Sequence, residues 1–133
     1  MPSEPVWLEL DLLIRINRRV TTSTGEPHQL RDLGLLESAW AKPINRWSYE
    51  GEEDLLRLAV ALMAGVAQNH PFAQGNKRTA FEAGLALLQA NGFMLVSELD
   101  SAEFADDFVA LIEHHTTEQA FAERLRPHVV AIG

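Results

Sequence analysis

A short polar segment between two apolar stretches holds the residues of this sequence that are best suited to chemistry. It contains His70 and, a few residues later, Gly75, Asn76, Lys77 and Arg78. Gly and Asn tolerate left-handed backbone angles, and a turn of that kind points successive N–H groups into one concavity that can bind an anion. Two cations beside the free N–H groups of a helix N-terminus make a phosphate pocket. His70 at its rim could accept a proton from an attacking hydroxyl, so the segment suits phosphoryl or nucleotidyl transfer.

Each of these features also has an ordinary structural explanation. A Gly-Asn pair before a helix is often only a turn, a histidine near a helix end often bonds a spare carbonyl, and a Lys-Arg pair is commonly solvated. However, Lys77 and Arg78 lie where the helix dipole disfavours cations by roughly 0.3–1 kcal/mol each. Their placement becomes favourable when an anion occupies the site. We therefore interpret the segment as a phosphate site rather than as a plain turn.

Two strongly apolar stretches flank this segment and should position it. Residues 55–67 are almost wholly apolar, with Arg57 the exception, and residues 79–90 are mostly apolar. A helix that is apolar on nearly every side is buried on nearly every side. Pro71 cannot continue the first helix, and Phe72 is expected to turn inward as an anchor. The sequence therefore predicts an all-α fold in which two central buried helices are joined by the polar loop.

Further helices are expected to pack around this central pair. Residues 8–20 carry apolar side chains four apart, which predicts an amphipathic helix, and residues 21–27 are rich in turn formers. Asp32 is a suitable N-cap for a second helix over residues 33–42, which Pro43 should end. The remaining expected elements are an irregular loop or short hairpin over residues 44–51, extended residues at 93–96, a helix from Ser101 with Phe104, Phe108, Leu111 and Ile112 on its inner face, and a last helix over residues 117–126.

The composition limits the classes of protein that remain. The chain has 133 residues, 47% hydrophobic and 23% charged, which are ordinary values for one globular domain, and no repeat or linker divides residues 1–133. With 11 Lys and Arg against 19 Asp and Glu, the net charge is −8, which disfavours a general nucleic-acid binder or a protein of anionic membranes. The lack of cysteine excludes disulfides, thiol nucleophiles and zinc–thiolate sites. Without a signal-peptide pattern or a bilayer-length apolar stretch, a cytoplasmic protein is expected.

Two segments of the chain resemble a known family. Residues 70–78, which read His-Pro-Phe-Ala-Gln-Gly-Asn-Lys-Arg, resemble the Fic signature H-P-F-x-[D/E]-G-N-[G/K]-R. The lysine at the eighth place, followed by Thr79-Ala80, is typical of the death-on-curing (Doc) branch of this family. Residues 31–39, Arg-Asp-Leu-Gly-Leu-Leu-Glu-Ser-Ala, are similar to that branch's R-D-x-G-L-L-E-S-A segment. The resemblance spans about residues 8–126 and implies the all-α Fic fold, with the signature loop between two central helices.

The resemblance implies the toxin of a bacterial toxin–antitoxin pair. Doc-type proteins block translation by transferring the γ-phosphate of ATP to a hydroxyl of an elongation factor, whereas most other Fic proteins transfer AMP, which stays open as the alternative. For this chain the resemblance implies that His70 is the base that activates the target Ser or Thr hydroxyl. Gly75 and Asn76 form the anion nest, Arg78 binds nucleotide phosphate, and Lys77 assists where AMP-transferring members have Gly. The irregular residues 44–51 lie where the family has its flap, an edge that holds the target peptide by backbone pairing.

One position departs from the signature. Gln74 stands where the family has the Asp or Glu that holds Mg²⁺, a metal that prefers charged oxygen ligands. The Gln74 carbonyl oxygen could still contribute, directly or through water, but without the charge. Three outcomes stay open: the metal binds through the phosphates of the nucleotide, another acidic residue substitutes, or transfer is lost and a module that binds nucleotide or partner remains. A purely structural helical domain is a further alternative.

A separate antitoxin is the partner that the resemblance implies. Some family members carry an inhibitory helix with the motif [S/T]-x-x-x-E-[G/N], and this chain does not match it. Thr22 and Glu26 have the required spacing, but Pro27 follows them. We therefore expect inhibition by another protein, whose helix or disordered tail lies in a groove near the active site. Three aromatic residues could contribute to that groove or belong to the core: Trp40, Trp47 and Tyr49.

A second group of titratable residues is a weaker candidate. His114, His115, Glu118 and His128 could suggest a metal site, but adjacent histidines point to different faces of a helix. We interpret the histidine pair as a solvated helix end. The sequence contains no H-E-x-x-H zinc motif, no P-loop and no G-x-S-x-G motif.

Overall fold

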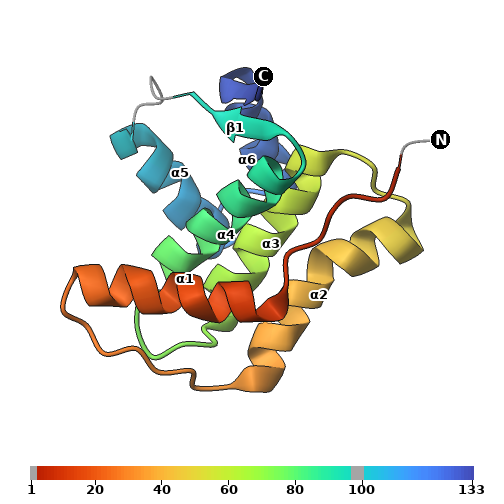
Figure 1. Cartoon of the computed structure of the whole chain (residues 1–133). Coiled ribbons are helices and arrows are strands. Elements are labelled where there is room, and N and C mark those ends of the chain that lie inside the picture. Colours follow the sequence, from red (N-terminus) through yellow and green to blue (C-terminus); the bar gives the residue numbers. More distant parts are fainter. Residues whose placement is uncertain (1–2, 97–100) are drawn as a thin grey trace.

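The computed structural model describes residues 3–96 and 101–133, and over these residues the chain is mainly helical (Figure 1). Two short strands near the C-terminus are the only sheet among the described residues. No helix of this described part combines the length and the apolar character that crossing a membrane requires. The elements follow in the order α1 (Leu10–Ser23), α2 (Leu33–Glu50), α3 (Leu55–Asn69), α4 (Asn76–Ala90), β1 (Phe93–Leu95), α5 (Ser101–Ile112), α6 (Glu118–Leu125), the 3₁₀ turn η1 (Arg126–His128) and β2 (Val129–Ala131).

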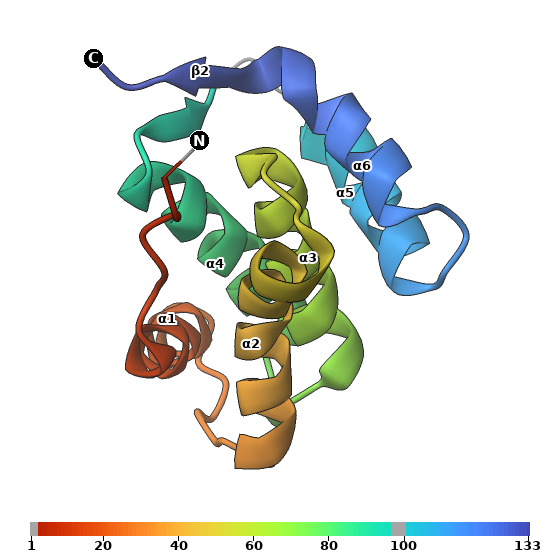
Figure 2. The ribbon, with the colours of Figure 1, turned by 90° about the vertical axis from the view of Figure 1, so that its right-hand side faces the viewer.

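Helix α3 is the centre of the molecule. Every residue from 58 to 67 is buried, and Asp54 caps the start of the helix by accepting hydrogen bonds from the N–H groups of Leu56 and Arg57. Helix α4 packs against α3 so closely that a Cβ at Gly84 would lie 2.2 Å from Cε of Met63. In Figure 2, α3 lies between α4 and α1 on one side and α5 and α6 on the other. The predicted central helix pair is confirmed.

Helix α4 is less enclosed than the sequence predicts. Its buried residues, which include Thr79, Ala83 and Leu87, lie on one face, whereas Lys77 and Arg78 at its start are exposed. The many small apolar residues of α4 suit close packing against α3 on that face, and their presence on the other face does not require burial.

Helix α2 is longer than the sequence predicts. It runs through Pro43, so the predicted end at residue 42 and the predicted irregular segment at residues 44–51 are wrong. Proline removes one backbone donor and disfavours a helix interior. Here Ala39 and Pro43 lie on the buried face of α2, and Arg46, one turn further on, pairs with Glu118 at the start of α6. Contacts on both sides of the proline hold the helix together, and tertiary packing outweighs the local signal.

The outer elements follow the predicted pattern with shifted ends. Helix α1 extends to residue 23, and the buried Leu13, Ile16 and Val20 face the core. Helices α5 and α6 bring together an aromatic cluster in which the ring centroids of Phe104 and Phe121 are 5.3 Å apart. Strand β1 pairs antiparallel with β2, which lies beyond the last predicted helix. Of the expected inner face of α5, Phe108 and Leu111 are buried, and Phe104 and Ile112 are partly buried against the core, as predicted.

Candidate functional site

The signature loop connects the two central helices, as predicted. His70 ends α3 in a left-handed conformation (φ 50°, ψ 54°), and Gly75, with φ 75°, precedes the first residue of α4. Phe72 is 1% exposed and anchors the loop in the core, which confirms the expected inward turn. The Asn76 side chain closes the loop, because its oxygen accepts from the Phe72 N–H at 3.0 Å and its Nδ2 donates to the Phe72 carbonyl at 2.8 Å.

The start of α4 offers unpaired donors to an anion. No side chain caps this helix end, and the first N–H groups of an α-helix have no intrahelical partner. Lys77 is exposed, and within the described residues its ammonium group makes no hydrogen bond or ion pair. A helix N-terminus with a free cation and free N–H groups attracts phosphate.

Arg78 is held by the chain itself. One guanidinium nitrogen donates to the Val20 carbonyl oxygen at 2.9 Å, and the other lies 3.3 Å from Oγ1 of Thr24 and forms an ion pair with Glu26. Hydrogen bonds from the Thr24 hydroxyl and from Arg78 hold the pKa of the Glu26 carboxyl below its ordinary value, although partial burial opposes this shift. A phosphate that binds Arg78 therefore has to compete with the Glu26 carboxylate.

Glu26 is a residue of the site that the sequence analysis set aside. It has the spacing from Thr22 that the inhibitory motif requires, but Pro27 breaks the motif. The structure nevertheless brings Glu26 to Arg78, from the segment between α1 and α2. The Thr-x-x-x-Glu spacing was the signal that could have drawn attention to it.

His70 presents a free imidazole at the other end of the loop. Its side chain is exposed, and no described residue forms a hydrogen bond with the ring. Its backbone carbonyl accepts a hydrogen bond from the Arg31 guanidinium at 2.7 Å, which fixes the position of the main chain. The ring is therefore free to accept a proton from a group outside the protein.

An extended segment before α2 runs beside the loop, at a different place from the flap that was predicted at residues 44–51. Residues 44–51 are not at this edge, because all but the last belong to α2. Instead Leu30 forms an isolated antiparallel bridge with Phe72. Hydrogen bonds on either side support this pairing, since Arg31 N–H donates to the Pro71 carbonyl at 2.8 Å and Ala73 N–H donates to that of Gln29 at 3.0 Å.

The residues around the loop do not fit a Mg²⁺ site made by the protein alone. Gln74 is exposed, and its side chain offers only a neutral carbonyl oxygen. The nearby carboxylate that the structure shows, Glu26, is already paired with Arg78. Within residues 3–96 and 101–133, no group of three or more His, Cys, Asp or Glu residues is arranged to hold a metal ion, and Glu118 pairs with Lys42 at 3.0 Å.

A cavity of about 470 Å³ lies beside the two cations, between the end of α1, the start of α4 and α5. Apolar side chains from all three helices line it, and among the described residues its charged side chains are Lys77, Arg78 and Glu82. The three aromatic residues that could contribute to a groove or belong to the core do not line this cavity. The Trp40 indole donates to the Leu8 carbonyl at 2.7 Å, Trp47 is partly buried on α2, and Tyr49 is 85% exposed near the end of α2.

Known proteins are similar in sequence to the part of the chain that carries the loop. Residues 7–88 match the Fic/DOC family. A protein named Toxin Doc from Mycolicibacterium smegmatis (strain ATCC 700084 / mc(2)155) is 37% identical over 77 residues, which cover 57% of this chain and 59% of that relative, less than two thirds of its length. A protein named Protein kinase doc from Escherichia phage P1 is 31% identical over 97 residues, 73% of this chain and 75% of the relative. With a helical pair that presents the signature loop and a family match over more than half of its residues, the chain belongs to the Fic/DOC family.

Proposed function

We propose that this protein is a Doc-type toxin that transfers the γ-phosphate of ATP to a Ser or Thr hydroxyl of a translation elongation factor. One observation carries the proposal: the loop offers a free His70 imidazole at one end and an anion site with Lys77 and Arg78 at the other. The names of the two relatives, Toxin Doc and Protein kinase doc, support a toxin and a kinase of this kind.

The chemistry follows from these positions. His70 takes the proton as the hydroxyl oxygen forms its bond to the γ-phosphorus, and the bond from that phosphorus to the bridging oxygen of the β-phosphate breaks, which leaves ADP. The N–H groups of Gly75 and Asn76, together with Lys77, stabilise the negative charge on the phosphate oxygens. Arg78 joins them when phosphate replaces Glu26 as its partner.

The proposal requires no metal ligand from the loop. Mg²⁺ binds ATP through phosphate oxygens and keeps several waters, so the metal can arrive with the nucleotide. Gln74 could offer such a metal only a neutral oxygen. We therefore expect the affinity of the protein for ATP to depend less on Mg²⁺ than it would with a carboxylate at this position.

We propose two protein partners for this site. The target peptide lies along the extended segment beside the loop and pairs with the N–H and C=O of Leu30, which none of the hydrogen bonds between this segment and the loop uses. A separate antitoxin covers the site, as the relative named Toxin Doc suggests. An elongation factor as target places the reaction in the cytoplasm.

Induced expression in a bacterial host tests the proposed function. The wild-type protein should arrest growth, and His70→Ala should abolish the arrest while the purified variant keeps its thermal stability. His115→Ala is the matched control, because the side chain of His115 is 72% exposed and lies outside the loop. Growth arrest by His70→Ala as strong as that by the wild type would overturn the proposal.

The two alternatives predict different products. AMP transfer would add a nucleotide to the target, and the mass of the modified elongation factor distinguishes that adduct from a phosphate. A binding module without turnover is favoured by the neutral Gln74 and by the ion pair that occupies Arg78. It would bind ATP and leave the mass of the target unchanged.

A further inference from the structure

A fully buried asparagine lies directly behind the signature loop. Asn17 of α1 is 0% exposed, and its Nδ2 donates to the Gln74 carbonyl oxygen at 2.8 Å and to Oγ1 of Thr79 at 3.0 Å. Its Oδ1 lies 2.7 Å from Nδ1 of His28. A buried polar side chain with every atom satisfied holds its partners in a defined geometry.

The hydrogen bond to Gln74 sets the direction of a donor in the anion site. In a trans peptide unit the C=O and the following N–H point in opposite directions, and no peptide bond within the described residues is cis. Because Asn17 draws the Gln74 carbonyl toward α1, the N–H of Gly75 points away from α1. Among the described residues, nothing accepts a hydrogen bond from this N–H, so it is free for a ligand.

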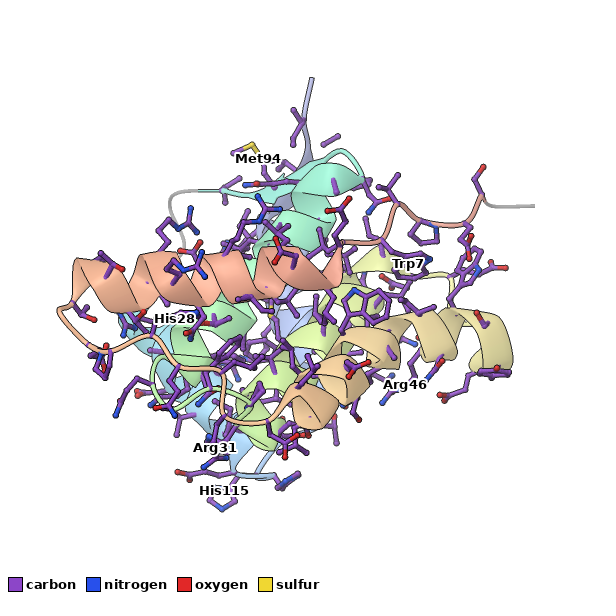
Figure 3. The ribbon with its side chains drawn as sticks, turned by 60° about the horizontal axis from the view of Figure 1, so that its bottom comes forward. Trp7, His28, Arg31, Arg46, Met94 and His115 are labelled. Carbon is purple, nitrogen blue, oxygen red and sulfur yellow. The ribbon has the colours of Figure 1, made fainter. Side chains whose placement is uncertain are left out.

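His28 orients the asparagine. The Gln74 carbonyl can only accept, so the amide nitrogen of Asn17 faces it and the amide oxygen faces His28. Nδ1 of His28 must then carry the proton that it donates to Oδ1. In Figure 3, His28 lies on the segment below α1, which is continuous with residues 29–32 beside the loop.

We propose that Asn17 and His28 are positioning residues of the phosphate site. Asn17 turns the peptide between Gln74 and Gly75 so that the Gly75 N–H faces the phosphate, and His28 keeps the Asn17 amide in that orientation. The inference rests on the proposed function, because it assigns the Gly75 N–H to the phosphate of the donor nucleotide. It adds residues that lie outside the signature and that the sequence analysis did not single out.

Two-dimensional ¹⁵N–¹H NMR of the full chain, titrated with inorganic pyrophosphate and with ATP, tests this role. In the wild type, the Gly75 amide proton should shift downfield as the probe binds. Asn17→Asp has the same shape but no N–H to donate, so the peptide between Gln74 and Gly75 loses the hydrogen bond that fixes its orientation. We expect this variant to lose the Gly75 shift and to bind ATP about tenfold more weakly, equivalent to about 1.4 kcal/mol.

Two further comparisons separate positioning from general stability. Thr79→Val removes the second hydrogen bond that Asn17 Nδ2 donates but leaves the bond to Gln74, so it should keep the Gly75 shift even if it lowers the melting temperature. His28→Asn retains a donor near the position of Nδ1 and should bind ATP like the wild type, whereas His28→Leu should weaken binding. These variants keep the test decisive if Asn17→Asp does not fold.

Each outcome has a distinct meaning. An unchanged Gly75 shift and ATP affinity in folded Asn17→Asp, or equal effects of His28→Asn and His28→Leu, would overturn the positioning role and leave the proposed function standing. Pyrophosphate binding that depends on Asn17 in a protein that transfers no phosphate would support the positioning role and overturn the proposed function. A wild-type protein that binds neither probe would overturn both.

Discussion

Replacing Gly75 with alanine should destabilise the protein through two separate effects. Gly75 has φ 75°, a conformation that costs an L-residue roughly 1–2 kcal/mol. An alanine Cβ would also lie 3.1 Å from Cγ2 of Thr21 and 3.4 Å from Nδ2 of Asn17. Both of these residues are fully buried and hydrogen-bonded, so neither can move aside freely, and overpacking of this kind adds about 1–3 kcal/mol. We expect a total loss of about 2–5 kcal/mol in the free energy of unfolding.

Gly51→Ala is the matched control for this variant. Gly51 has φ 71°, but nothing lies within 4 Å of the Cβ that alanine would add. It should therefore show only the backbone cost of about 1–2 kcal/mol. Urea denaturation of both variants, with unchanged m-values, measures the difference. If Gly75→Ala loses no more stability than Gly51→Ala, the close contact between α1 and the signature loop is not as the structure describes it.

Three more predictions concern packing, competition and pH. Gly84→Ala would place a Cβ 2.5 Å from Cγ of Met63 and should lower the free energy of unfolding by about 1–3 kcal/mol in urea denaturation. Adding Met63→Ala to the same chain should recover part of that loss. Strictly additive effects of the two substitutions would contradict the contact. Glu26→Gln should bind pyrophosphate more tightly than the wild type in calorimetry, because Arg78 loses a competing carboxylate, and equal affinity would argue against competition. Burial opposes ionisation of Asp54, but hydrogen bonds from Arg126 and from backbone N–H groups outweigh it and hold the Asp54 pKa below its ordinary 3.8. Ionised Asp54 therefore stabilises the folded protein above pH 3.8, and this stabilisation is lost as the pH falls through the lowered pKa. In acid denaturation, Asp54→Asn should show a smaller decline in the free energy of unfolding over this pH range than the wild type.

The central helices and their loop could be predicted because local chemistry determines them. Residues 55–67 are apolar on nearly every side, Pro71 ends the helix, and Gly75 permits the turn into the next one. Each of these signals comes from neighbouring residues in the chain. The signature residues His70 to Arg78 therefore lie on the elements where the sequence placed them.

The remaining features depend on contacts between residues that are distant in sequence. Pro43 is a strong local signal for a helix end, but packing of α2 against α3 overrides it, so residues 44–50 are helical. The extended segment that pairs with the loop is formed by residues 29–32 instead. The partners of Arg78 and of Gln74 lie more than fifty residues away on α1 and after it. No spacing rule connects Asn17 with Gln74, so Asn17 becomes part of the site only in three dimensions. For Glu26 the Thr-x-x-x-Glu spacing was a signal, but only the structure pairs Glu26 with Arg78.

Transfer of label from ATP to a purified elongation factor tests the central proposal most directly. ATP labelled at the γ-phosphate and ATP labelled at the α-phosphate are incubated in parallel with the wild-type protein and with His70→Ala. We predict label on the elongation factor from the γ position alone, and none with His70→Ala. Label from the α position, or equal transfer by His70→Ala, would contradict the proposal of a phosphotransferase with His70 as its base.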